Sequence, residues 1–488
     1  MKKILPILLL LLLLVACRHE VQNPTRVDEL PPIYPDYLGV TIPVGIAPMN
    51  FDFEGGAHDW LDVVVKGSKG GELHSNGESV DFDIDEWHDL LAQNRGGELT
   101  FTLCVENGGQ WTQYRDFKMY VSPYALDEWG LTYRRVAPGY EVYAHMGLYQ
   151  RDLATFDEYE ILSNTRTPGA CVNCHTSNRT DPQSFLFHVR GDHGATALQK
   201  DGHLEMLDTK TDQTLGLCVY PYWHPDGRYV AFSTNTTRQA FHVVKDERIE
   251  VFDHESDLQV LDTETHQLLL SPLLKTDSHN ETYPVFSPDG RTLYFCTAQK
   301  REFPLEARKV RYNLCSIAFD AATGTFGTEV DTLIHAEADS MSVAFPRPSY
   351  DGRYLMLTLA HYGTFPIWHK EADLYLLDLQ TRSLRAMDEV NSPDTESFHN
   401  WSDNSHWFVF SSRRGDGLYT RLYLASLDEK GRATKPFLLP QRRPRAFYNR
   451  LMYSYNTPDF TKSKVELDAR QAANEILSEK RTGLSVRP

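Results

Sequence analysis

Residues 223–232 read WHPDGRYVAF, and three later segments of the chain repeat this pattern. The copies are FSPDGRTLYF at 286–295, PSYDGRYLML at 348–357 and a degenerate WSDNSHWFVF at 401–410. In a turn of this kind the Asp side chain hydrogen-bonds its own backbone and Gly accepts a positive φ. The residues that follow are aromatic, aliphatic and β-branched, as in a strand. The pattern therefore predicts a tight turn followed by a strand, repeated along the chain.

A second repeated pattern is an apolar strand that ends in Asp. Its copies are Leu204–Asp208, Leu258–Asp262, Tyr312–Asp320, Leu374–Asp378 and Leu422–Asp428. Two strand signatures that recur at a shared period are typical of a β-propeller or a solenoid. We expect a propeller of five to seven blades, most simply six, whose ring closes through residues near 186–208 or 450–460.

The Asp226-Gly227-Arg228 segment and its copies resemble the strands of TolB-like propellers. The resemblance covers roughly residues 196–440. It implies a propeller fold, but no particular activity, because propellers carry many unrelated functions.

The remaining regions have other patterns. Residues 39–125 alternate apolar and polar side chains between Gly pairs, for example over Val80–Ile84 and Leu99–Leu103, and this predicts an N-terminal β-sandwich. Residues 126–195 lack a clear period and are expected to be irregular. The predicted fold is therefore mainly β: a sandwich, an irregular segment, a propeller over 196–460, and a helix with a tail over 461–488.

The sharpest chemical motif lies in the irregular segment, where residues 171–175 read CVNCH. This CxxCH sequence matches the attachment motif of c-type haem. The thiols of Cys171 and Cys174 are spaced to form thioethers with the two vinyl groups of one haem. His175 then becomes the proximal ligand of the iron. The motif predicts one covalent haem c, although the flanking sequence does not resemble a cytochrome c domain.

The sixth haem ligand is left open by the sequence. The candidates are His188, Met146, His193 and His145, and an open position is an alternative. Arg166, Arg179 and Arg190 are candidate partners of the haem propionates. Three further histidines, His361, His369 and His399, are expected in propeller loops.

Other chemistry at the same cysteines is also conceivable. A zinc site would use Cys171 and Cys174 with His188 and His193. A redox-active CxxC or a plain disulfide are further alternatives.

The N-terminus has the layout of a secretory signal. Lys2 and Lys3 precede an apolar run over Ile4–Val15, which is too short to span a membrane. The sequence LVAC at 14–17 resembles a bacterial lipobox, which implies cleavage before Cys17 and lipid attachment to its sulfur. We therefore expect a signal peptide over 1–16, a tether over 17–38, and a lipid-anchored envelope protein, most simply at the outer membrane.

Charge and cysteine usage limit the function further. The chain has 67 acidic and 49 basic residues and a formal net charge of −18, which argues against nucleic-acid binding. In an oxidising compartment Cys104, Cys218, Cys296 and Cys315 could form up to two disulfides, with Cys296 and Cys315 on consecutive strands. Buried free thiols are an equal alternative.

These observations predict a haem-bearing envelope lipoprotein that serves electron transfer or redox and small-ligand sensing. Its propeller would dock an envelope protein or a redox partner. A haem-independent, TolB-like scaffold that binds a protein or glycan is one alternative, and a haem-dependent, peroxidase-like enzyme is another. The sequence contains no hydrolase or nucleotide-binding signature.

Overall fold

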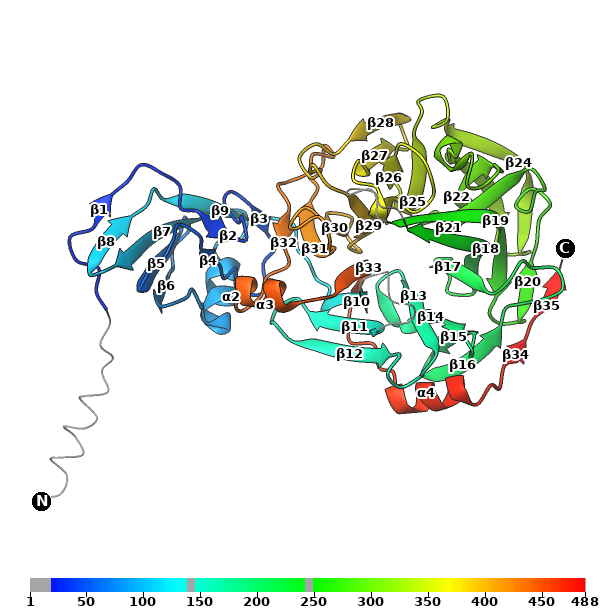
Figure 1. Cartoon of the computed structure of the whole chain (residues 1–488), viewed down its shortest axis with the longest axis horizontal. Helices are drawn as coiled ribbons and strands as arrows, with labels where there is room; N and C mark the ends of the chain where they lie inside the picture. The colour runs from blue at the N-terminus through cyan, green and yellow to red at the C-terminus, as the bar shows by residue number, and fades with distance from the viewer. Residues whose placement is uncertain (1–18, 138–144, 242–248, 488) are drawn as a thin grey trace, which may run out of the picture. The chain divides into compact units, whose positions relative to one another are not determined.

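The computed structural model describes residues 19–137, 145–241 and 249–487 (Figure 1). They form two compact units, one that runs to Pro123 and includes Pro440–Arg450, and one that contains Tyr124–Leu439 and Leu451–Pro488. The predicted signal peptide and the lipidation site Cys17 lie outside the described residues. Within the described part of the chain, no helix has the length and apolar character that a membrane span requires.

The first unit is built on one seven-stranded sheet. Its main path is β1 (Thr25–Arg26), β8 (Gln110–Gln113), β7 (Glu98–Asn107), β5 (Trp60–Gly67) and β6 (Glu72–Gly77), while β9 (Phe117–Val121) joins β7 to β3 (Thr41–Ile42). A separate pair contains β2 (Ile33–Tyr34) and β4 (Asp52–Phe53), and the helices are α2 (Ile84–Gln93) and α3 (Pro444–Arg450).

The N-terminal β-sandwich is not confirmed, and one strand expected in it is wrong. Residues 80–83 are not a strand but lead into α2. The carboxylate of Asp83 caps this helix, accepting hydrogen bonds from the backbone N–H groups of Asp85 at 3.0 Å and Glu86 at 3.1 Å. The alternating pattern was misleading because Phe82 and Trp87 are buried in the same core, where their rings stack with centroids 5.5 Å apart.

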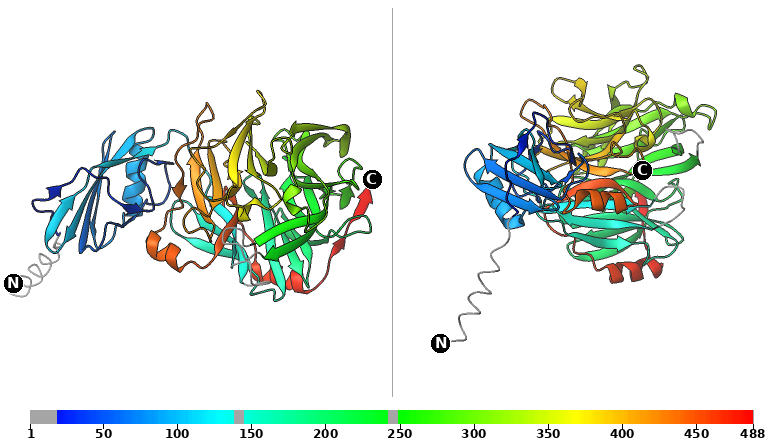
Figure 2. Two further views of the ribbon diagram at one scale, coloured as in Figure 1. Left: turned by 45° about the horizontal axis from the view of Figure 1, so that its top comes forward. Right: turned by 60° about the vertical axis from the view of Figure 1, so that its left-hand side comes forward.

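The second unit is a six-bladed propeller (Figure 2). Blade 1 contains β33 (Ser454–Thr461), β10 (Gly130–Val136), β11 (Met146–Asp152) and β12 (Glu158–Ser163); blade 2 contains β13 (Ala170–Asn178), β14 (Asp181–Gly191), β15 (Ala195–Lys200) and β16 (His203–Asp208). Blade 3 contains β17 (Cys218–Trp223), β18 (Tyr229–Phe241), β19 (Ile249–Asp262) and β20 (Gln267–Leu269); blade 4 contains β21 (His279–Phe286), β22 (Thr292–Gln299), β23 (Asn313–Asp320) and β24 (Thr325–Ile334). Blade 5 contains β25 (Ser342–Pro348), β26 (Tyr354–Ala360), β27 (Asp373–Asp378) and β28 (Ser383–Ala386); blade 6 contains β29 (Glu396–Trp401), β30 (Trp407–Ser412), β31 (Arg421–Ser426) and β32 (Phe437–Leu438).

The ring closes through a strand from the far end of the chain. Strand β33 lies innermost in blade 1 and pairs with β10, so that Gly130 is opposite Thr461. The six inner strands β33, β13, β17, β21, β25 and β29 contact one another in this order around the ring. The six-bladed propeller is therefore confirmed, and closure uses one of the two predicted regions.

The C-terminal segment continues along the outside of the ring. The helix α4 (Ala469–Leu477) buries Ala472 and Ile476 in a core cluster shared by blades 1 and 2. Two short strands then add to blade edges: β34 (Thr482–Gly483) pairs with β16, and β35 (Ser485–Arg487) pairs with β20.

The repeated Asp-Gly-Arg segments form the turns between the first and second strands of blades 3, 4 and 5. In each turn the Asp carboxylate accepts a hydrogen bond from the Arg backbone N–H, at 2.8 Å for Asp226, 3.1 Å for Asp289 and 3.0 Å for Asp351. The glycines that follow have φ between 73° and 74°. The predicted turn chemistry is confirmed.

Residues 126–195 are not irregular, because they contain β10 to β14 of blades 1 and 2. Strand β11 is buried over most of its length, so it lacks the alternation that marks a half-exposed strand. The turn after β13 has no Asp-Gly-Arg segment, and Arg179 adopts the positive φ of 56° there.

Of the two alternatives for Cys104, Cys218, Cys296 and Cys315, the structure has free thiols, as at all six described cysteines. Cys296 is opposite Leu314 and Cys315 is opposite Phe295 on the paired strands β22 and β23. The two thiols consequently point to opposite faces of blade 4, and each is buried in a different core cluster.

Candidate functional site

Each inner strand of the propeller has the same irregularity at its centre. One non-glycine residue has a positive φ of 47–53°, and the pairing with the second strand shifts register at this point. These six residues, which we call the bulge residues, are Cys174, Tyr220, Tyr283, Phe345, Phe398 and Thr457. Bulges redirect side chains, and left-handed backbone is unfavourable for bulky residues. Because the six strands share this conformation, it is a requirement of the ring rather than of one site.

A cavity of about 410 Å³ lies along the axis of the propeller. Five inner strands contribute to its wall, through the bulge residues Cys174, Tyr220, Phe345, Phe398 and Thr457 and the residues beside them. Phe365 and Trp368, from the loop between β26 and β27, add further aromatic surface. Three arginines also reach it: Arg134 from β10, Arg190 from β14 and Arg347 from β25.

The CxxCH motif lies on β13 and only part of it faces this cavity. Cys174 and His175 line the cavity wall, together with Asn173. Cys171 is not among the lining residues. Its sulfur is buried 3.4 Å from Nη2 of Arg134, and the same nitrogen lies 3.2 Å from the sulfur of Met146.

His175 is a buried, neutral histidine. Its Nε2 lies 3.1 Å from the hydroxyl oxygen of Thr132, while Nδ1 is buried and has no hydrogen-bond partner among the described residues. Burial, helped by the nearby Arg134 charge, lowers the pKa of His175 to about 4. The imidazole is therefore uncharged at neutral pH, which is the form that can ligate a metal.

These residues fit a covalent haem in part. A thiol at Cys174, an imidazole with an orphaned ring nitrogen at His175, aromatic walls and arginines are the groups that a haem c site uses. Two features of the structure do not fit a haem attached to both cysteines and ligated by His175. Cys171 lies behind the cavity wall, and the Nε2 atom of His175 is bonded to Thr132.

The predicted sixth ligands do not line the cavity. His188 is buried on β14 with Nδ1 3.3 Å from the hydroxyl of Thr196, and Met146 contacts Arg134. His193 pairs with Glu479 at 3.2 Å, and the ring of His145 packs against Tyr453.

Sequence reasoning missed one histidine of the cavity, His399. It lies on β29 rather than in the expected loop, directly after the bulge residue Phe398, as His175 follows Cys174. Its Nε2 lies 3.0 Å from the carbonyl oxygen of Met356, and its Nδ1 is buried without a partner in the described part of the chain. Alignment of the inner strands on their bulges would have found it.

The predicted propionate partners are dispersed. Arg166 is partly exposed beside Glu160 at 3.6 Å, and the guanidinium of Arg179 lies 4.9 Å from the ring centre of Tyr350. Only Arg190 reaches the large cavity.

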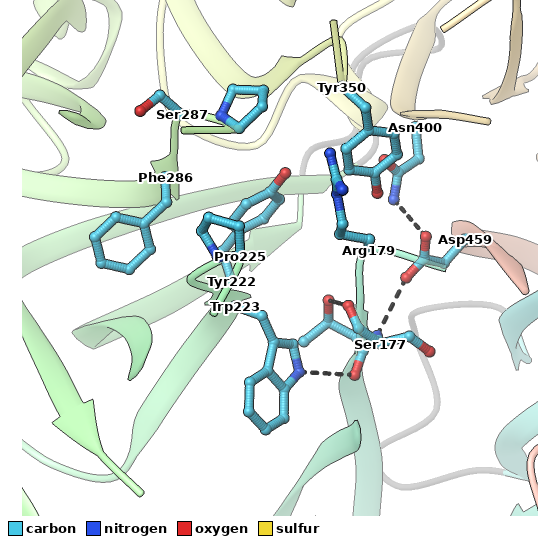
Figure 3. A pocket seen from close by; sticks show the side chains of 12 residues that line it. Ser177, Arg179, Tyr222, Trp223, Pro225, Phe286, Ser287, Tyr350, Asn400 and Asp459 are labelled. Carbon is cyan, nitrogen blue, oxygen red and sulfur yellow. Dashed lines mark hydrogen bonds between the residues drawn. The ribbon is translucent and has the colours of Figure 1, made fainter. Parts of the chain in front are cut away.

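A second, small cavity of about 20 Å³ adjoins the large one (Figure 3). Thr176, Tyr222, Asn400 and Asp459 line both cavities and thus form the wall between them. The carboxylate of Asp459 accepts hydrogen bonds from the Asn400 amide at 2.7 Å and from the backbone N–H of Ser177 at 3.3 Å. Burial raises the pKa of Asp459 to about 7. The small cavity has room for about one water molecule.

The zinc alternative gains no support from the geometry. Within the described ranges, no three His, Cys, Asp or Glu side chains converge closely enough to hold a metal ion. His193 in particular is engaged by Glu479, away from the cysteines.

No protein-family model matches the chain, and no curated protein resembles it in sequence. Among solved structures, an oligogalacturonate lyase from Vibrio parahaemolyticus is similar over 59% of this chain and 85% of that one, with 11% identity and a TM-score of 0.33. A puromycin-hydrolysing peptidase of Mycobacterium tuberculosis covers 83% of this chain at 12% identity and a TM-score of 0.35. Prolyl oligopeptidase B of Galerina marginata covers 64% at 10% identity and a TM-score of 0.37. The chain matches only 57% and 45% of these two peptidases.

Proposed function

We propose that the central cavity holds one haem c, linked covalently to Cys171 and Cys174 and ligated by His175. The observation that carries this proposal is the position of the CxxCH motif. Two of its residues, Cys174 and His175, line the 410 Å³ cavity between aromatic and arginine side chains. We further propose that the residues around Cys17 anchor the chain by lipid to the bacterial envelope, where an envelope protein or redox partner docks on the propeller.

The haem would supply one-electron redox chemistry or reversible binding of a small ligand. The chain's own residues would position it and exclude water. Aromatic side chains such as Phe345, Phe398 and Trp368 provide flat apolar contacts. The Thr132 hydroxyl holds the ring of His175, whose low pKa keeps it unprotonated. For both thiols to react, the Cys171 side chain must leave its contact with Arg134.

The test is an absorption spectrum of the denatured, pyridine-reduced protein after expression with a cytochrome c maturation system. We expect the band of a haem with two thioether links, and a complete loss of covalent haem in the Cys171→Ala, Cys174→Ala double variant. Cys104→Ala, a buried thiol of the first unit, is the matched control and should keep full haem content. A wild-type chain without covalent haem, in cells that mature a control cytochrome, would refute the proposal.

A second candidate is a propeller that binds a small ligand without haem. The buried position of Cys171 and the bond between His175 and Thr132 favour it, because both describe a cavity that is complete without thioethers. This candidate predicts that the double cysteine variant folds normally and keeps its ligand.

A further inference from the structure

Three arginines that reach the central cavity have no ion-pair partner among the described residues. Arg134, Arg190 and Arg347 come from three different blades, and each is partly buried. Across the described ranges, no carboxylate oxygen lies within 4.0 Å of any of their guanidinium nitrogens. The hydrogen bonds of Arg134 go to the sulfurs of Met146 and Cys171, and Arg347 donates to the carbonyl of its neighbour Pro346 at 3.0 Å.

Two other largely buried arginines of the same propeller are paired with acids. Arg413 lies 3.4 Å from a carboxylate oxygen of Asp394, and Arg414 lies 2.9 Å from one of Glu396. Removing a charge from water without a partner is costly, so structural arginines are normally paired in this way. Three unpaired guanidinium groups around one cavity therefore point to a ligand that pairs with them.

The two acids nearest these arginines do not balance their charge. Asp253 is hydrogen-bonded to Thr237 and Asn235 at 2.7 Å each, and Asp459 is bonded to Asn400 and Ser177. Burial raises the pKa of Asp253 to about 6 and that of Asp459 to about 7, so at pH 7 Asp253 is mostly ionised and Asp459 about half ionised. Together they carry less charge than the three guanidinium groups. The cavity keeps an excess of positive charge although the chain as a whole is strongly acidic.

We propose that the central cavity recognises the carboxylate groups of a partly apolar small molecule, with Arg190 and Arg347 as the principal anchors and Arg134 as a third. Guanidinium groups bind carboxylates through paired, charge-assisted hydrogen bonds. The apolar part of the ligand would contact Tyr220, Phe345 and Trp368. The carboxylates are either the propionates of a haem or those of a free polycarboxylate. The inference deepens the proposed function but does not depend on thioether links.

The experiment uses the full chain produced without haem maturation and measures binding by calorimetry. One pair of probes is protoporphyrin IX and its dimethyl ester in the same non-ionic detergent. The other pair is citrate and its triethyl ester. We expect one or both acids to bind at least tenfold more tightly than the matching ester. Arg190→Gln and Arg347→Gln should each weaken that acid about tenfold or more.

Arg311→Gln is the matched control, because in the described part of the chain Arg311 bonds only the carbonyl oxygens of Arg308 and Val310, and it does not line the cavity. It should leave binding unchanged. Tighter binding of the porphyrin acid identifies haem propionates, whereas tighter binding of citrate identifies a free polycarboxylate.

Equal binding of acid and ester, no binding of either acid, or full affinity in both cavity variants would overturn the inference. A folding defect is separated by thermal unfolding: loss of an unpaired charge should leave the midpoint unchanged or raise it, whereas a structural role would lower it. The pyridine spectrum is independent of this result, so failure of haem attachment and failure of carboxylate recognition are distinguishable.

Discussion

Strands β13 and β29 occupy equivalent places in blades 2 and 6, and their backbones are nearly the same. Cys174 and Phe398 have φ values of 50° and 49° at the bulge, and both strands shift register there. A histidine follows each bulge residue. His175 and His399 each have Nε2 bonded to the preceding blade, and within the described ranges neither Nδ1 has a partner. Burial lowers the pKa of both, to about 4 and about 3.

The comparison separates what the fold imposes from what is particular to blade 2. A buried, neutral histidine after the bulge occurs in both strands, so His175 has this state without any need for a haem. The difference lies at the positions four residues and one residue before the histidine. These are Cys171 and Cys174 in β13, whereas blade 6 has Thr395, directly before β29, and Phe398. The proposed haem attachment therefore rests on the cysteines, because the ring alone accounts for the state of the histidine.

The largest expected difference between β29 and β13 is the loss of stability when their bulge residues, Phe398 and Cys174, are truncated to alanine. Phe398 is buried, with its ring 4.9 Å from Phe345 and 5.9 Å from Phe365, so Phe398→Ala should cost about 3–5 kcal/mol of propeller stability. Cys174 is only partly buried, and Cys174→Ala should cost about 1 kcal/mol or less. Urea unfolding of the unloaded chain measures both. Equal costs would mean that Cys174 is a packing residue like Phe398.

A third histidine, His369, is expected to change the stability with pH in the opposite direction to His399. Burial alone would lower the pKa of His369, but hydrogen bonds and charge from Glu250 and Glu371 outweigh it and raise the pKa to about 9. His369 thus stabilises the fold below about pH 6.5, and this contribution is lost as the pH rises through 9. This contribution of His369 to the free energy of unfolding is roughly 3 kcal/mol.

His399 acts in the opposite direction. Its folded pKa lies below the unfolded value, so its contribution is present above about pH 6.5 and falls by roughly 2 kcal/mol between pH 6.5 and 4.5. The measurement is the unfolding free energy of wild type minus that of His369→Gln, and of wild type minus His399→Gln, from pH 4.5 to 9.5. The two differences should slope in opposite directions, and slopes of the same sign would contradict the assignment.

The smallest expected effect concerns the partner of His175. In β29 the ring nitrogen meets a backbone carbonyl, whereas in β13 it meets a side chain, Thr132, which can be changed. Thr132→Val should cost about 1 kcal/mol and shift the imidazole nitrogen resonances of His175. Thr196→Val, which removes the equivalent bond to His188, is the control and should leave the His175 resonances in place. Unchanged His175 resonances in Thr132→Val would disprove the bond.

The sequence was informative where structure is determined locally. The Asp-Gly-Arg turns located blades 3, 4 and 5 because the turn is stabilised by hydrogen bonds within five residues. Blade 1 and the first strands of blade 2 were missed, whereas the last strand of blade 2 was found as Leu204–Asp208. The missed strands are largely buried, and β10 pairs with β33, a strand far away in the sequence. The CxxCH motif could be read from the sequence. The bulge of β13, which places Cys174 but not Cys171 at the cavity, could not, because no sequence pattern marks a positive φ at a non-glycine residue such as Cys174. Arg134, Arg347 and His399 meet only when the ring closes, so no local pattern could bring them together.

The pairing of Gly130 with Thr461 has a consequence for the order of assembly. A chain made from its N-terminus produces the outer strands of blade 1 first and the strand that seals them last. Until β33 pairs with β10, blade 1 lacks its innermost strand and the ring is not closed, and the short strands β34 and β35, which pair with blades 2 and 3, follow β33 in the chain. The cavity wall is therefore completed only by β33, which is made last of the six inner strands.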